Sequence, residues 1–214
     1  MSSTFVNYHL RCTNASRVAR IAEEIITTRA FVSPATDGWI TVCDETSQFL
    51  DPIELDRLAM EFSRRLETVL FTFLIPDIQV FAYHVFDNGD LLDEYNSTPE
   101  LLGPVSDQAR FRLAGHPSVI LKHCRPGTAL SEVQSILIRS QAGITGGFAS
   151  SASAHDRAHR LAALLGIDHN HAIFSFEDLD TNLAPNAEQY TKIEGRTFQR
   201  PLRRPIPRRL PPRG

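Results

Sequence analysis

Cysteine, lysine and long apolar runs are all scarce in this sequence. Its 214 residues hold three cysteines, Cys12, Cys43 and Cys124, which are widely spaced, odd in number and free of any CxxC pattern. Neither a disulfide framework nor a cysteine-rich zinc site is therefore expected, and the thiols suit a reducing compartment. No stretch reaches the roughly 18 apolar residues of a membrane span, and the N-terminus lacks a secretory signal pattern. We expect a cytoplasmic protein without a membrane partner.

Motifs for catalysis and nucleotide binding are also missing. Gly143, Gly146 and Gly147 could turn backbone N–H groups toward a phosphate, but neither a P-loop lysine nor a GxGxxG turn accompanies them. There is no GxSxG elbow, and Cys124 beside His123 is adjacency in sequence, which does not make a catalytic pair.

Charge is divided unevenly along the chain. The formal net charge is −3, yet seven of the 22 basic residues lie after residue 195, where there are no acids. Residues 1–195 therefore carry 15 basic and 25 acidic residues, a net charge of −10. The sequence thus combines an acidic body with a basic tail, and its 42% hydrophobic content is enough for one packed domain.

The stretch from Thr68 to Asn96 predicts the centre of a β-sheet. Val80–Phe86 is apolar or aromatic on both faces apart from His84, which is typical of an interior strand. Asn88-Gly89 then favours a tight type I′ turn, so Leu91–Tyr95 should return as the antiparallel partner. The preceding run is Thr68–Ile75. Its periodicity fits both a strand and the end of a helix, so both alternatives stay open.

Other patterns place further strands and helices. Alternation over Phe5–Cys12 predicts a strand whose inner face carries Val6, Tyr8, Leu10 and Cys12. Asp51-Pro52-Ile53-Glu54 is a clear helix start. We expect helices at Ser16–Arg29, Pro52–Glu67, Pro117–His123, Ser131–Arg139 and Ala154–Leu165, strands at Trp39–Asp44 and His171–Phe176, and a flexible link at Gly143–Ser153.

These elements predict a single α+β domain over residues 1–181. Its mixed β-sheet should contain the central antiparallel hairpin, with the helices Ser16–Arg29 and Pro52–Glu67 packed on it, and a crossover should join Trp39–Asp44 to a later strand. Residues 182–214 are rich in arginine and proline and are expected to be a disordered tail.

Three phrases, WITVCDE from Trp39, LLDEYNS from Leu91 and HRLAALLGI from His159, resemble a group of uncharacterised bacterial cytosolic α+β proteins of similar size. The resemblance covers about Trp39 to Gly166 and its motifs are short. It implies an α+β fold, and it carries over no activity, cofactor or catalytic residue.

Four of the eight histidines gather late in the chain and form a candidate metal site. His155 and His159 are four apart on a predicted helix, while His169 and His171 would share one face of an extended segment. Together they could hold a zinc-like ion, with Asp156 or Asp168 behind them. The alternative is that these histidines only edge a helix–sheet contact or lie in solvent.

Two other groups of charged residues could carry function. Asp90, Asp93 and Glu94 could pair for acid–base chemistry, or could simply be a hydrated turn. The tail arginines could bind nucleic acid or an acidic protein surface, or could be a neutral terminus. They are Arg196, Arg200, Arg203, Arg204, Arg208, Arg209 and Arg213.

The sequence therefore favours a non-enzymatic binding or interaction protein, similar in kind to immunity proteins and adaptors. Such proteins need only a stable sheet and a charged face, which the acidic body supplies. A protein partner is expected first, with nucleic acid as a further possibility through the tail, and no cofactor is expected. The alternative function is a metal-dependent hydrolase that uses the histidine cluster.

Overall fold

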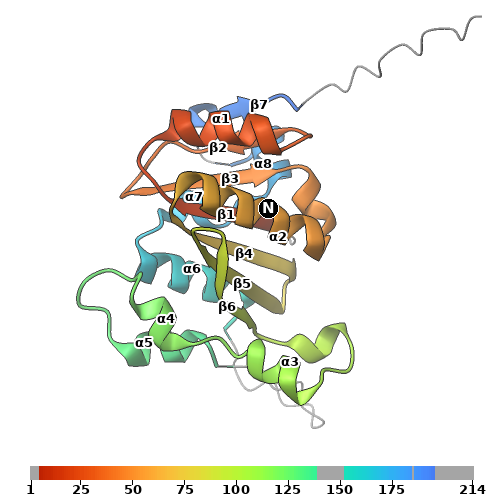
Figure 1. The fold of residues 1–214 in the computed structure, drawn as a ribbon, viewed down its shortest axis with the longest axis vertical. Helices are drawn as coiled ribbons and strands as arrows, with labels where there is room; N and C mark the ends of the chain where they lie inside the picture. Colours follow the sequence, from red (N-terminus) through yellow and green to blue (C-terminus); the bar gives the residue numbers. More distant parts are fainter. Residues whose placement is uncertain (1–4, 139–151, 185, 196–214) are drawn as a thin grey trace, which may run out of the picture.

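The computed structural model describes residues 5–138, 152–184 and 186–195, which form a seven-stranded sheet with helices on both faces (Figure 1). The strands are β1 Phe5–Arg11, β2 Ala30–Val32, β3 Trp39–Asp44, β4 Val69–Asp77, β5 Val80–Asp87, β6 Asp90–Asn96 and β7 Thr191–Ile193. The helices are α1 Ala15–Ile25, α2 Pro52–Leu66, α3 Asp107–Arg112, α4 Pro117–Leu121, α5 Leu130–Ile136, α6 Ala154–Leu165, α7 His169–Ala172 and α8 Phe176–Asp180. Short 3-10 turns are η1 Thr46–Phe49, η2 Pro99–Leu102 and η3 Ala187–Gln189.

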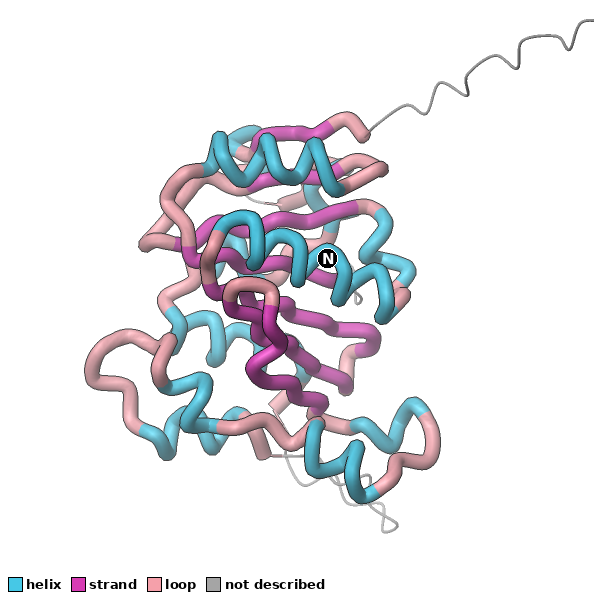
Figure 2. Tube along the Cα trace, viewed as in Figure 1, coloured by secondary structure: helices cyan, strands magenta, loops and turns pink. Residues whose placement is uncertain are grey.

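The sheet has the order β6-β5-β4-β1-β3-β2-β7, and Figure 2 shows its strands as one continuous stack. The α+β class and the hairpin are confirmed. All six pairings among the described strands are antiparallel, whereas we expected a mixed sheet. The reason is that β1 lies between β3 and β4, the two parallel strands that the expected crossover joins.

The first four strands and two helices repeat one unit twice. In each unit, β1-α1-β2 and β3-α2-β4, two parallel strands are joined through a helix and separated by a strand of the other unit. This is the split β-α-β arrangement of ferredoxin-like folds. The hairpin partners β5 and β6 extend the sheet beyond β4, and β7 extends it beyond β2.

Helices α1 and α2 cover one face of the sheet. Asn14 caps α1 by accepting from the Arg17 backbone N–H at 2.9 Å, and Asp51 caps α2 by accepting from that of Ile53 at 3.0 Å. The α2 prediction is confirmed to within a residue. Helix α1 ends at Ile25, not Arg29, because the chain turns there into β2, a strand that the sequence analysis did not include. The buried side chains on this face include Val18, Ile21, Leu58, Phe62, Tyr8 and Leu10.

Helices α4, α5 and α6 cover the opposite face. Of the side chains expected on the inner face of the first strand, Val6, Tyr8 and Leu10 are buried and Cys12, just past β1, is partly buried. Phe5, Asn7 and His9 are fully buried as well. That expectation was incomplete because it took β1 as covered on one side only. Helix α6 spans Ala154–Leu165 as predicted; Ser153 caps its start, and Gly166 closes it at φ +85°.

Two segments of the chain, Thr68–Ile75 and His171–Phe176, differ in how well their sequence patterns indicate a strand. The open question of Thr68–Ile75 is settled, because β4 is a strand paired with both β1 and β5. The strand predicted at His171–Phe176 is wrong. Asp168 caps α7 through the Asn170 N–H, and Ser175 forms a reciprocal cap with Asp178 at the start of α8, so short helices form there.

The folded chain continues past the domain boundary predicted at residue 181. Strand β7 pairs with β2, with Lys192 opposite Phe31, so residues 191–193 belong to the sheet and the tail assignment is wrong for them. The three-residue strand was missed because it has too little apolar pattern to register as a strand. The predicted link at Gly143–Ser153 lies mostly outside the described residues, as does 196–214.

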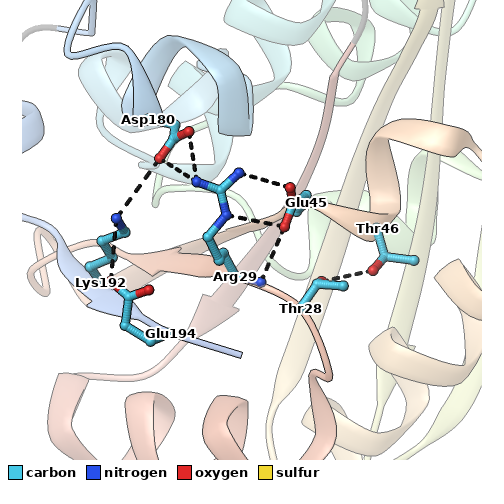
Figure 3. Close-up of polar contacts among 7 residues, drawn as sticks. All are labelled: Thr28, Arg29, Glu45, Thr46, Asp180, Lys192 and Glu194. Atoms are coloured by element: carbon cyan, nitrogen blue, oxygen red, sulfur yellow. Dashed lines mark hydrogen bonds and ion pairs between the residues drawn. The ribbon is translucent and has the colours of Figure 1, made fainter. Parts of the chain in front are cut away.

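Arg29 fixes this C-terminal part to the body (Figure 3). Its guanidinium donates to Glu45 Oε1 at 2.8 Å and to both oxygens of Asp180 at 2.8 and 2.9 Å. It also lies 5.0 Å from the centre of the Phe176 ring. The hydrogen bond to Glu45, followed by the bonds to Asp180, raises the pKa of Arg29. The hydrogen bond between Arg29 and Glu45 also lowers the pKa of Glu45. Lys192 of β7 lies 4.0 Å from Asp180, so β7 joins the same network.

The centre of the aromatic core gives the first testable prediction. Phe81 is fully buried, and its ring centroid lies 5.3 Å from that of Phe73 and 6.3 Å from that of Tyr95. Phe81→Ala should lower the free energy of unfolding by about 3 to 5 kcal/mol in denaturant titrations, because it removes apolar contacts and leaves a cavity. Phe49→Ala is the control, since Phe49 is 81% exposed and should change stability by less than about 0.5 kcal/mol. A loss below about 1 kcal/mol for Phe81→Ala would contradict this account of the core.

Candidate functional site

An open groove lies between α2 and the β5–β6 hairpin. Its volume is about 610 Å³. The α2 wall is made by Ile53, Asp56, Arg57 and Met60, and the hairpin wall by Phe86, Gly89, Asp90 and Leu91. Such clefts, lined by apolar side chains with a few polar groups, are the usual form of binding sites.

The α2 wall comes from residues that lie outside the buried stripe of the helix. The buried stripe of α2 includes Leu55, Leu58 and Phe62. Ile53 and Met60 lie two turns apart on the other side, where Ile53 is 81% exposed and Met60 39% exposed. Exposed apolar residues at this spacing are the sequence signal of the groove, and they lie outside the buried stripe on which the helix prediction rests.

The hairpin wall depends on a close approach at Gly89. Asn88 and Gly89 have φ of +52° and +92°, as the predicted turn requires. The Gly89 N–H donates to Ser63 Oγ at 3.1 Å, and a Cβ at Gly89 would meet Arg64 Cβ at 3.0 Å. A side chain at this position would therefore push the turn away from α2. The turn presents Leu91, 47% exposed, to the groove.

Charged groups of both signs line the groove, namely Arg57, Asp56 and Asp90, and the first two are engaged. Arg57 pairs with Glu54 at 2.6 Å, and that hydrogen bond lowers the pKa of Glu54. Asp56 on the α2 wall contacts His84 Nδ1 at 2.7 Å, and Asp90 stands on the hairpin wall. The groove is thus apolar with a carboxylate on each wall.

The four histidines of the predicted metal site are placed in different surroundings. The rings of His159 and His169 stack, with centroids 4.2 Å apart and planes at 21°. His155 packs edge-on against Phe5 at 5.8 Å, and His171 against Tyr190 at 5.4 Å. The extended segment expected for His169 and His171 is instead helix α7.

Within the described residues, no group of three or more His, Cys, Asp or Glu side chains is placed to hold a metal ion. The four-histidine zinc site and the hydrolase built on it stay predictions from sequence.

The three acids of the hairpin do not form a common site. Asp90 lies at the turn, while Glu94 pairs with Arg112 at 2.6 Å. Asp93 is buried and accepts hydrogen bonds from Tyr83 and His116. Asp93 and Glu94 follow one another in a strand, so they face opposite sides of the sheet. The predicted glycine site at 143–147 and the tail arginines lie outside the described residues.

A buried polar layer on the second face was missed by the sequence analysis. Asn7 Nδ2 donates to the Ala172 carbonyl at 3.2 Å, and His9 Nδ1 lies 2.9 Å from Thr41 Oγ1. The Cys43 thiol lies 3.1 Å from Asn7 Oδ1 and 3.5 Å from the Phe174 carbonyl. Burial raises the pKa of Cys43, so the thiol is inert. These groups bind the α7–α8 segment to β1 and β3.

Within the described residues no helix is both long and apolar enough to cross a membrane. Comparison with protein-family models, with curated proteins and with solved structures finds no match for this chain. The groove, the histidines and the buried polar layer must therefore be interpreted from their own chemistry.

His9 generates a prediction about pH. Burial, and then the neighbouring His171, lower the pKa of His9 to about 3. An unfolded chain protonates this histidine below about pH 6.5, so the unfolded state takes up a proton that the folded state excludes. Stability conferred by neutral His9 is therefore present above pH 6.5 and falls as pH drops toward 3, by at most about 1.4 kcal/mol per pH unit.

Chemical unfolding of wild type and His9→Asn between pH 7.5 and about 5 measures this contribution. The variant should lose less stability than wild type over that range, although it starts lower because the site is repacked. Asp44, whose pKa burial raises to about 6, acts in the opposite direction but is common to both proteins. Parallel pH profiles would show that His9 does not titrate on unfolding.

Proposed function

We propose that this protein is a binding or interaction protein, of the immunity or adaptor kind, whose partner occupies the groove between α2 and the β5–β6 hairpin. The observation that carries the proposal is the cluster of exposed apolar side chains on two facing walls. Single exposed apolar residues are common, whereas a contiguous apolar surface marks an interaction site. Ile53, Met60 and Leu91 form such a surface around an open groove.

The occupant that best fits this groove is an amphipathic helix of a partner protein. Ile53 and Met60 are seven residues apart, about 10 Å along α2, which matches two turns of a helix lying alongside. Helices that bind in grooves use apolar anchors at similar spacing. An added strand is a poorer fit, because the free edge of β6 is interrupted by an irregularity at Leu92 and closed by the Tyr95–Ala114 bridge.

Charge favours a basic helix. Asp56 and Asp90 stand on opposite walls of the groove, and residues 1–195 carry a net charge of −10. An acidic field speeds encounter with a cationic partner and disfavours an acidic one. We place the interaction in the cytoplasm, a location that the three free cysteines support.

Defined peptides can test the proposal by fluorescence anisotropy. The probe is a basic amphipathic helix of about five turns, and its comparison peptide carries Glu in place of each Lys. Wild type should bind the basic peptide at least about tenfold more tightly than the acidic one, with an affinity that falls as salt rises. Ile53→Glu and Leu91→Glu should each abolish binding without lowering the melting temperature by more than a few degrees, since both side chains are exposed.

Leu183→Glu is the matched control, because Leu183 is 71% exposed and lies outside the groove. It should bind the basic peptide as wild type does. The proposal fails if the peptide binds Ile53→Glu and Leu91→Glu as tightly as wild type, or if both peptides bind equally well.

A further inference from the structure

A second site lies at the opposite side of the hairpin, around His116. The Asp93 side chain is fully buried, whereas the His116 ring is 48% exposed. Asp93 Oδ1 lies 2.8 Å from His116 Nδ1, and Asp93 Oδ2 accepts from the His116 backbone N–H at 2.9 Å. One carboxylate therefore fixes both the backbone and the ring of the same histidine.

Tyr83 completes the support of this pair. Its hydroxyl donates to Asp93 Oδ2 at 2.8 Å, and burial, followed by the Asp93 charge, raises the pKa of Tyr83 far above its ordinary value. The phenol thus stays a donor. Gly115 makes the approach possible, because a Cβ there would meet the Tyr83 oxygen at 2.7 Å.

The hydrogen bonds define the state of the imidazole. A carboxylate that receives donors from Tyr83 and the His116 N–H is an acceptor for the ring as well, which assigns the ring proton to Nδ1. In the neutral imidazole Nε2 then carries the free electron pair, and the His116 side chain is 48% exposed. A histidine oriented in this way by a buried carboxylate is the arrangement that activates imidazoles in catalysis.

An apolar surface stands beside the exposed ring. Phe111 is 73% exposed and packs edge-on against His116, with ring centroids 6.0 Å apart. Helix α3, which carries Phe111, buries none of its residues. An aromatic side chain that remains exposed next to an oriented imidazole offers a platform for an aromatic group of a small molecule.

From this geometry we propose that His116 is a nucleophile in acyl transfer from activated aryl esters. Nε2 attacks the ester carbonyl carbon and forms the N–C bond, the C–O bond to the aryl group breaks, and the aryloxide leaves with the bonding electrons. The acyl-imidazolium keeps its Nδ1 proton toward Asp93, whose negative charge offsets the new positive charge. Water then attacks the acyl carbon, the N–C bond breaks, and its electron pair returns to Nε2. The hydroxyl group of that water becomes part of the acid, and its remaining proton goes to the aryloxide, which becomes the phenol.

Hydrolysis of p-nitrophenyl acetate, followed by release of p-nitrophenol, tests the proposal. His116→Gln should lower kcat/KM by about 10-fold or more, in line with the loss of an oriented catalytic group. His123→Gln, the same change at a histidine that lies outside the site and packs edge-on against Phe71, should leave the rate unchanged. Phe111→Ser should raise KM and leave kcat near the wild-type value.

Asp93 acts as a positioning residue. A comparison of kcat with KM distinguishes this role from a purely structural one. Asp93→Asn should lower kcat about 10- to 100-fold at unchanged KM. Tyr83→Phe, which removes one donor to the carboxylate, provides a milder variant if Asp93→Asn does not fold, and should lower kcat in the same direction. Mass spectrometry after a brief acid quench should find the acetyl group on His116.

Two results would overturn the proposal. One is a wild-type rate in folded His116→Gln, and the other is an acetyl group found only on other residues. Either would leave the Asp93–His116 pair as a structural tie between β6 and the segment before α4.

Discussion

The whole structure depends on the covering of β1 on both faces. This strand is fourth of seven in the sheet, and side chains from Phe5 to Leu10 are almost completely buried whichever way they point. The face of α1 and α2 is covered mainly by apolar side chains, and the Tyr8 hydroxyl there is hydrogen-bonded to Ser47. The second face carries Asn7 and His9, and buried polar groups must find hydrogen-bond partners or reduce stability. The Ala172 carbonyl meets Asn7, and the Phe174 carbonyl meets Cys43 of the neighbouring strand, so the α7–α8 segment closes this face.

The local parts of this fold could be predicted because each has a local cause. The Asn88-Gly89 turn, the Asp51-Pro52 helix start and the closure of α6 at Gly166 all depend on backbone preferences of a few adjacent residues. The error at His171–Phe176 arose where apolar alternation was weighed above two capping side chains, Asp168 and Ser175. Strand β7 was missed for a different reason. Three residues carry too little pattern, and their place is set by pairing with β2 far along the chain.

The candidate sites could be predicted only in part, because their residues meet through the fold. Asp93 was singled out from the sequence, but its partner His116 is 23 positions away and no spacing rule links them. The hairpin was foreseen, whereas the groove needs α2 beside it, held by the hydrogen bond from Gly89 to Ser63. The histidines near the C-terminus were grouped because they are close in sequence. The structure pairs His159 with His169, while the surroundings of His155 and His171 are set by Phe5 and Tyr190.

One irregularity in β6 explains how a single hairpin contributes to both proposed sites. Phe86 pairs with Leu91, and Val85 pairs with Asp93, so Leu92 is an extra residue between the two pairs. In a regular strand Leu91 and Asp93 would point to the same face, since side chains alternate with a period of two. The extra residue reverses the alternation. Leu91 therefore joins Phe86 on the α2 side, where it lines the groove, and Asp93 joins Val85 on the other side, where it holds His116. Deleting Leu92 would turn one of these two side chains away from its position, so the proposed binding groove and the proposed imidazole site both depend on that one residue.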